Sequence, residues 1–169
     1  MNSDIKTITV NGYPYYVDKL LGKGKGGYSY LVRDGEKRYV LKQIHHEPCS
    51  YYNFGNKIQS ELDDYATLKN TGIKLPKLIE ADKINERILK QYIDGETADA
   101  LIKRNSLPDF ALKRVRDMSK ILRTVGLNID WYPTNFVLLG KELFYIDYEC
   151  NAFSEQWSFE GWGIKYWTK

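Results

Sequence analysis

Three glycines and three polar residues later in the chain have spacings that suit phosphate chemistry. The stretch LLGKGKGGYSYLV has a G-x-G-x-x-G spacing at Gly22, Gly24 and Gly27. Without a Cβ atom at these positions, the backbone N–H groups of a loop can approach phosphate oxygens closely. Further along, NIDWYPTNF contains Asp130 and Asn135 in a D-x-x-x-x-N spacing, and LFYIDYE contains Asp147. Carboxylate and amide oxygens are ligands that Mg²⁺ prefers.

Strand and turn patterns predict the elements around the glycines. The first part of the chain reads as three or four antiparallel strands, with hairpin turns at Asn11–Gly12 and Asp34–Gly35. The glycine loop lies between two of these strands. A helix is predicted next, because Gly72 follows apolar residues at helical spacing. These residues are Ile58, Leu62, Tyr65 and Leu68.

The later elements are strands, a long helix and a hairpin. KLPKLIEAD and RILKQYI read as strands, and NFVLLGKELFY reads as a hairpin that turns at Gly140–Lys141. The long helix is predicted to be capped by Ser106 and to end at Gly126. Its apolar stripe comprises Leu112, Val115, Met118, Leu122 and Val125. The tail, with Trp157, Trp162 and Trp167, is expected to fold back onto this part of the core.

This order of elements predicts an α+β fold in two lobes. Two common nucleotide-binding motifs with glycine-rich loops are excluded. The Rossmann unit starts a helix inside its glycine loop, whereas a strand, YSYLV, follows here. The Walker loop ends in Gly-Lys-Ser/Thr, which is missing.

The combined pattern resembles the protein-kinase-like superfamily, from about Leu21 to Glu149. A strand follows the glycines, Lys42 lies on the next strand in YVLKQI, and Glu61 comes on the following helix. The DxxxxN and IDYE segments then follow in order. The resemblance is greatest to compact atypical members, namely small bacterial and archaeal Ser/Thr kinases, lipopolysaccharide-type kinases, and aminoglycoside and choline phosphotransferases.

The resemblance implies a bilobal fold and a role for each residue. One minimal domain, 1–169, would comprise a β-rich N-lobe with one helix (1–93) and a truncated C-lobe (94–169). Lys42 would hold the α- and β-phosphates of ATP, and Glu61 would fix the lysine. Asp130 would orient the acceptor hydroxyl and take its proton. The other residues would cover the phosphates (Gly22, Lys23, Gly24, Gly27), read adenine at the hinge (Gln91, Tyr92, Ile93) and bind Mg²⁺ or Mn²⁺ (Asn135, Asp147).

Four departures from the family pattern concern Ser29, Asn128, Glu149 and the end of the chain. Glu149 stands where the family has a glycine. Ser29 replaces the usual valine of the glycine loop, and Asn128 replaces the usual histidine two residues before the catalytic aspartate. Only 20 residues follow Glu149, with no A-P-E motif and no peptide-binding helical subdomain. The favoured acceptor is a serine or threonine hydroxyl in a protein. A small-molecule kinase of the aminoglycoside or sugar type and a non-catalytic nucleotide-binding scaffold are the alternatives.

Composition and charge favour a cytoplasmic globular protein. The net charge of +3 does not favour nucleic acid as a partner, and no apolar run reaches the ~20 residues that span a bilayer. The start of the chain lacks the pattern of a signal peptide, and the two cysteines, Cys49 and Cys150, suggest a reducing compartment. Two kinds of partner stay open: a protein that completes the short C-lobe, and a second copy held by Tyr51, Tyr52 and Phe54.

Overall fold

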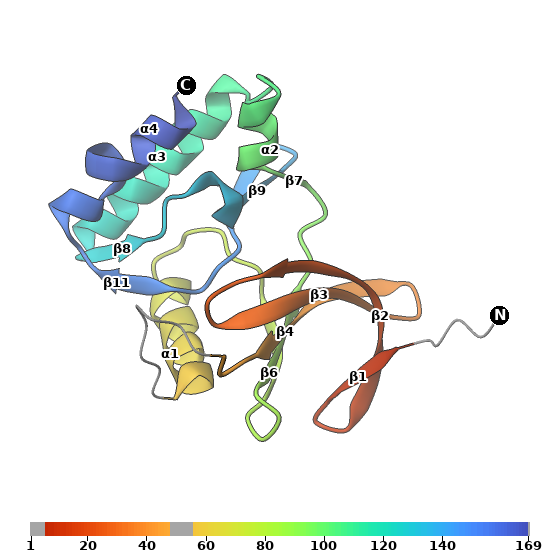
Figure 1. The fold of residues 1–169 in the computed structure, drawn as a ribbon. Helices are drawn as coiled ribbons and strands as arrows, with labels where there is room; N and C mark the ends of the chain where they lie inside the picture. Colours follow the sequence, from red (N-terminus) through yellow and green to blue (C-terminus); the bar gives the residue numbers. More distant parts are fainter. Residues whose placement is uncertain (1–5, 48–55, 169) are drawn as a thin grey trace. The chain divides into compact units, whose positions relative to one another are not determined.

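The computed structural model describes residues 6–47 and 56–168, and the chain forms two compact units (Figure 1). The first unit comprises Met1–Glu61 and Lys77–Tyr92, and the second comprises Leu62–Pro76 and Ile93–Lys169. The mixed α+β class is as predicted. Cys49 and the aromatic residues Tyr51, Tyr52 and Phe54 lie outside the described residues.

The first unit is built on an antiparallel sheet of six strands, in the order β1-β2-β3-β4-β6-β5. The sheet curls, and its concave shape is visible in Figure 1. A cluster of buried side chains covers one part of it: Val10, Tyr15, Val32, Leu41 and Leu89. The strands are β1 (Thr7–Val10), β2 (Tyr13–Lys23), β3 (Gly27–Asp34), β4 (Lys37–Ile44), β5 (Leu78–Asp82) and β6 (Arg87–Gln91).

The first hairpin turn is as predicted, and the second is shifted by one residue. Asn11 and Gly12 join β1 to β2 with φ angles of 49° and 85°, which suits a two-residue turn. In the second hairpin Asp34 still pairs with Lys37, so the turn residues are Gly35 and Glu36 rather than Asp34 and Gly35. The positive φ of 60° therefore falls on Gly35, the first turn residue.

Helix α1 (Lys57–Lys69) follows the sheet's first four strands, as predicted. It ends shortly before Gly72, whose φ of 88° requires a residue without a Cβ atom. The division between the two units falls within this helix, after Glu61. The helix was predicted to belong entirely to the first lobe.

The second unit contains two small sheets, β10-β9-β7 and β11-β8, together with helices. Its strands are β7 (Glu96–Thr97), β8 (Leu127–Ile129), β9 (Phe136–Leu139), β10 (Glu142–Tyr145) and β11 (Cys150–Ala152). Its helices are α2 (Ala98–Lys103), α3 (Asp109–Thr124), η1 (Pro133–Asn135), η2 (Glu155–Trp157), η3 (Phe159–Gly163) and α4 (Ile164–Trp167). The β9–β10 hairpin turns at Gly140–Lys141, as predicted. In the described part of the chain, no helix is both long and apolar enough to cross a membrane.

Helix α3 begins later than predicted, whereas its end is closed by Gly126, with a φ of 73°, as predicted. Its N-cap is Pro108, whereas the predicted cap, Ser106, donates its hydroxyl to the Arg104 carbonyl. The helix starts only after the proline, so Ser106 lies too far upstream to cap the first-turn N–H groups. Val125 is the C-cap and is 53% exposed, so the predicted apolar stripe stops at Leu122.

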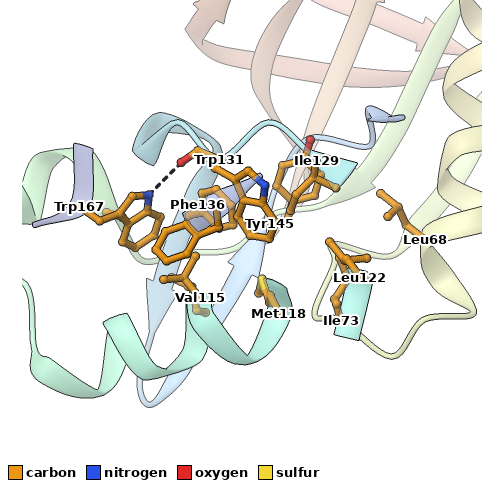
Figure 2. Packing of buried hydrophobic residues seen from close by; sticks show 13 residues of the cluster. Leu68, Ile73, Val115, Met118, Leu122, Ile129, Trp131, Phe136, Tyr145 and Trp167 are labelled. Carbon is orange, nitrogen blue, oxygen red and sulfur yellow. Dashed lines mark hydrogen bonds between the residues drawn. The ribbon is translucent and has the colours of Figure 1, made fainter. Parts of the chain in front are cut away.

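The core of the second unit is aromatic and includes the end of the tail. Figure 2 shows Val115, Met118 and Leu122 of α3 in one cluster with the rings of Trp131, Phe136, Tyr145 and Trp167. The Trp167 indole N–H donates to the Trp131 carbonyl at 2.8 Å. The tail therefore packs onto this core as predicted, although Trp157 is 51% exposed.

Candidate functional site

The glycine turn joins β2 to β3 and leaves open space beside two of its glycines. The Gly24 N–H donates to the Gly27 carbonyl at 2.8 Å, which closes the turn. A Cβ atom on Gly22 would meet nothing within 4 Å, and one on Gly24 would meet only the Gly27 carbonyl oxygen at 3.9 Å. At these two positions the backbone is accessible to a ligand.

Gly27 has a different role, because it packs against the strand that carries Lys42. A Cβ atom on Gly27 would lie 2.7 Å from the Gln43 carbonyl oxygen and 3.0 Å from Cε of Lys42. Contacts that short do not occur, so any larger residue would displace the neighbouring strand or the lysine. The third glycine of the motif therefore makes room for the lysine side chain.

Lys42 and Glu61 form the ion pair that the family resemblance implies. Lys42 lies on β4, and its Nζ is 2.8 Å from Oε1 of Glu61 on α1. The two side chains are only 19% and 10% exposed. Removing charges from water is costly, and the short charge-assisted hydrogen bond between the two groups offsets this cost. The result is a fixed ammonium group beside the glycine turn.

Lys23, a predicted phosphate ligand, is engaged by a carboxylate next to the turn. Its Nζ lies 3.1 Å from Glu47 and 5.2 Å from the centre of the Tyr28 ring. The Tyr28 hydroxyl also donates to Glu47, at 2.8 Å. This hydrogen bond lowers the pKa of Glu47, and the bond to Glu47 raises the pKa of Lys23. Lys23 would have to leave Glu47 to contact a phosphate.

His45 contacts the glycine turn through the Gly24 carbonyl and was not predicted as a site residue. Its Nε2 lies 2.9 Å from the Gly24 carbonyl, and its Nδ1 accepts the Glu47 N–H at 3.3 Å. A carbonyl oxygen can only accept, so Nε2 is the donor in the contact with Gly24. The adjacent pair His45–His46 gave no sequence signal for this role, because the bond depends on the register of β4 against the turn.

Of the predicted hinge residues, Gln91 ends β6 while Tyr92 and Ile93 follow it, and the boundary between the units falls after Tyr92. The Gln91 N–H donates to the Lys77 carbonyl at 2.9 Å, and the Gln91 side chain accepts the Lys77 N–H. The Arg38 guanidinium lies over the Tyr92 ring at 5.1 Å. The Ile93 carbonyl accepts the Gly95 N–H, while no described residue accepts the Ile93 N–H. Of these groups, the Ile93 N–H is the one that adenine could engage.

In the second unit, Asp130 and Asn135 lie in one short segment that its own hydrogen bonds shape. Asp130 Oδ1 accepts the Tyr132 N–H at 3.1 Å, and the Asn135 side-chain amide donates to the Asp130 carbonyl at 3.3 Å. Pro133 starts the 3-10 turn η1, which brings Asn135 back toward Asp130. The D-x-x-x-x-N spacing thus produces a compact loop.

Asp147 lies on the segment after β10, and this segment is hydrogen-bonded to the Asp130–Asn135 loop. The Ile146 N–H donates to the Asn135 carbonyl at 2.9 Å. Asp147 Oδ1 accepts the N–H groups of Tyr148 at 2.8 Å and Glu149 at 3.4 Å. Asp130, Asn135 and Asp147 therefore belong to one connected set of segments within the second unit.

Each of these three side chains has one polar atom engaged in the loop and one oxygen that accepts no described donor. In residues 6–47 and 56–168, no protein group donates to Oδ2 of Asp130, Oδ1 of Asn135 or Oδ2 of Asp147. Two carboxylates and an amide form an all-oxygen donor set that fits Mg²⁺ or Mn²⁺. Across the described residues there is no group of three His, Cys, Asp or Glu side chains placed to hold a metal ion. The candidate cation site therefore depends on the asparagine.

A hollow of about 210 Å³ lies beside the Asp130 segment. It is lined by Asp99, Ile102, Lys103, Tyr132, Pro133 and Tyr166. Asp99 and Lys103 form an ion pair at 2.8 Å, and the rings of Tyr132 and Tyr166 meet edge to face at 5.0 Å. This hollow was not predicted, because the short helix α2, which carries three of its lining residues, was not predicted.

No protein-family model and no curated protein sequence matches the chain. The chemistry of the residues described above is therefore the basis for a functional proposal.

Proposed function

We propose that the protein is an ATP-dependent phosphotransferase of the protein-kinase-like class. The observation that carries the proposal is the Lys42–Glu61 ion pair beside the glycine turn. A positioned ammonium group next to an accessible glycine backbone suits the α- and β-phosphates of a nucleotide. The six-stranded unit would be the nucleotide-binding lobe, and the second unit would be the catalytic lobe.

The reaction would transfer the γ-phosphoryl group of ATP to a hydroxyl group. The acceptor oxygen would attack the γ-phosphorus, the bond to the β–γ bridging oxygen would break, and ADP would leave. Asp130 would take the hydroxyl proton on Oδ2, since its Oδ1 is occupied by the Tyr132 N–H. Asn135 and Asp147 would hold Mg²⁺ or Mn²⁺, which supplies positive charge at the phosphates.

Two acceptor classes are proposed. The first is a serine or threonine hydroxyl in a protein. A small hydroxyl compound is the second, and the hollow lined in part by Tyr132 and Pro133 favours it, because these residues lie inside the Asp130–Asn135 loop.

Calorimetric titration with ATP and Mg²⁺ tests the nucleotide-binding half of the proposal. Lys42→Met should weaken ATP binding at least tenfold but leave adenosine binding unchanged, because the lysine would contact phosphates alone. Lys37→Met is the matched control, since Lys37 is an exposed residue of the same strand. The proposal is wrong if the wild-type protein does not bind ATP at millimolar concentration, or if the two variants bind it equally well.

A further inference from the structure

The hydroxyl group of Tyr145 joins two segments of the second unit that carry candidate site residues. It donates to the Glu149 carbonyl at 2.7 Å and accepts a longer bond, 3.5 Å, from the Asp130 N–H. The ring is fully buried and packs 5.3 Å from the Phe136 ring. Figure 2 shows it within the aromatic core of this unit.

The bond to Glu149 closes a short loop around Asp147. The chain leaves β10 at Tyr145 and returns to the Tyr145 hydroxyl four residues later, with Asp147 between the two ends. Asp147 Oδ1 is held inside this loop by the Tyr148 and Glu149 N–H groups. The carboxylate therefore has little freedom to rotate as long as the loop stays closed.

The same hydroxyl also reaches the first residue of the catalytic loop. Asp130 is engaged through its backbone, so its side chain stays available for chemistry. The phenol O–H donates to the Glu149 carbonyl, and the same oxygen accepts the Asp130 N–H.

The residue two positions before Asp130 makes no such connection. Asn128 donates to the Trp157 carbonyl at 2.7 Å and accepts the Trp131 indole N–H at 2.7 Å. Its side chain thus binds the tail and the core. Among the described side chains, Tyr145 is the one whose hydrogen bonds connect the Asp130 segment with the end of the Asp147 loop.

We propose that Tyr145 is a positioning residue that sets the Asp130 and Asp147 segments in register for phosphoryl transfer. This inference rests on the proposed function. Small displacements of a reacting group cost large factors in rate, so the loss of this hydroxyl should lower kcat without weakening ATP binding to the first unit.

Tyr145→Phe tests the inference, with Tyr148→Phe as its matched control. Both tyrosines are fully buried, and each hydroxyl donates one 2.7 Å bond to a backbone carbonyl. The Tyr148 hydroxyl, however, donates to Pro76. Both variants should lower Tm by comparable amounts. Tyr145→Phe should lower kcat about tenfold or more with the KM for ATP within twofold, whereas Tyr148→Phe should keep kcat within twofold.

Hydrogen exchange of the Asp130 amide provides a second measurement that does not depend on activity. Exchange should accelerate in Tyr145→Phe and not in Tyr148→Phe. The inference is overturned if both variants lose kcat equally, if neither does, or if the Asp130 amide exchanges at the wild-type rate in Tyr145→Phe. Absence of transfer by the wild-type protein would refute the proposed function and the catalytic role of Tyr145 with it, while the exchange rates would still report whether the hydroxyl joins the segments.

Discussion

Nζ of Lys42 lies 2.8 Å from Oε1 of Glu61, although the two residues are separated by 19 positions and lie on a strand and a helix. The lysine side chain passes directly beside Gly27, where a Cβ atom would be 3.0 Å from its Cε atom. The glycine motif and the ion pair are therefore one structural feature, in which the missing side chain of one residue allows the placement of another.

A double-mutant cycle should detect strong coupling between these two residues. Lys42→Met and Glu61→Gln each leave one unpaired charge in a little-exposed position. The sum of the two single losses in unfolding free energy should therefore exceed the loss in the double variant. We expect a coupling energy of about 1–3 kcal/mol from urea unfolding. The same cycle with Lys37 in place of Lys42 should give a value near zero. Additive effects for Lys42 and Glu61 would contradict the described geometry.

Alanine substitutions should separate the three glycines of the motif into two classes. Gly27→Ala should destabilise the fold by about 1–3 kcal/mol, because the new Cβ atom overlaps the Gln43 carbonyl. Gly22→Ala should change stability by less than about 0.5 kcal/mol, since the site is open. Urea unfolding measures both. If Gly22→Ala is the more destabilising change, the description of the turn is wrong.

Two tail tryptophans should differ greatly in their contribution to stability. Trp167 is 3% exposed and bonded to the Trp131 carbonyl, so Trp167→Ala should cost about 3–5 kcal/mol. Trp157→Ala removes a residue that is half exposed and should cost about 1 kcal/mol or less. Thermal unfolding of the two variants provides the comparison, and similar losses would show that the tail does not pack as described.

The thiol of Cys150 should be unreactive at moderately alkaline pH. Burial and the neighbouring Asp64 raise its pKa from 9.0 to about 12. At pH 8 the thiolate fraction is therefore about a thousandfold lower than that of an unperturbed thiol. Because the folded-state pKa is raised, the protonated thiol contributes to the stability of the fold. This contribution is complete below pH 9 and is lost as the pH rises toward 12. Iodoacetamide should label the Cys49→Ser protein at least 100-fold faster in urea than in buffer at pH 8. Equal rates would contradict this environment.

Local chemistry allowed several elements to be predicted, and long-range pairing explains the errors. Asn11–Gly12 forms a turn because both residues tolerate positive φ, which is a local property. The second hairpin was misplaced by one residue because the pairing of Asp34 with Lys37 fixes its register. Strands β8 and β11 have three residues each and exist through pairs such as Ile129 with Cys150, so they carry no periodic pattern.

The candidate site likewise has contacts that could be predicted from the sequence and contacts that depend on long-range pairing. The family resemblance implied that Lys42 and Glu61 would meet, and the two residues form an ion pair between a strand and the next helix. The contact of His45 with Gly24 and the role of Tyr145 could not be predicted from residue types alone. In LFYIDYE, Tyr145 reads as an ordinary core aromatic residue, and its hydroxyl gains its role only through the chain's return at Glu149.

Phosphate transfer from γ-labelled ATP, measured together with nucleotide binding, tests the central claim most directly. The wild-type protein, Asp130→Asn, Asp147→Asn and the exposed control Asp109→Asn would be incubated with Mg²⁺ or Mn²⁺, alone and with a generic protein substrate. We predict transfer by the wild type and the control. Asp130→Asn should lose about 100-fold or more of the rate while binding ATP normally, and Asp147→Asn should lose metal-dependent binding as well. Equal labelling in all four proteins, or no labelling in any despite ATP binding, would contradict the account.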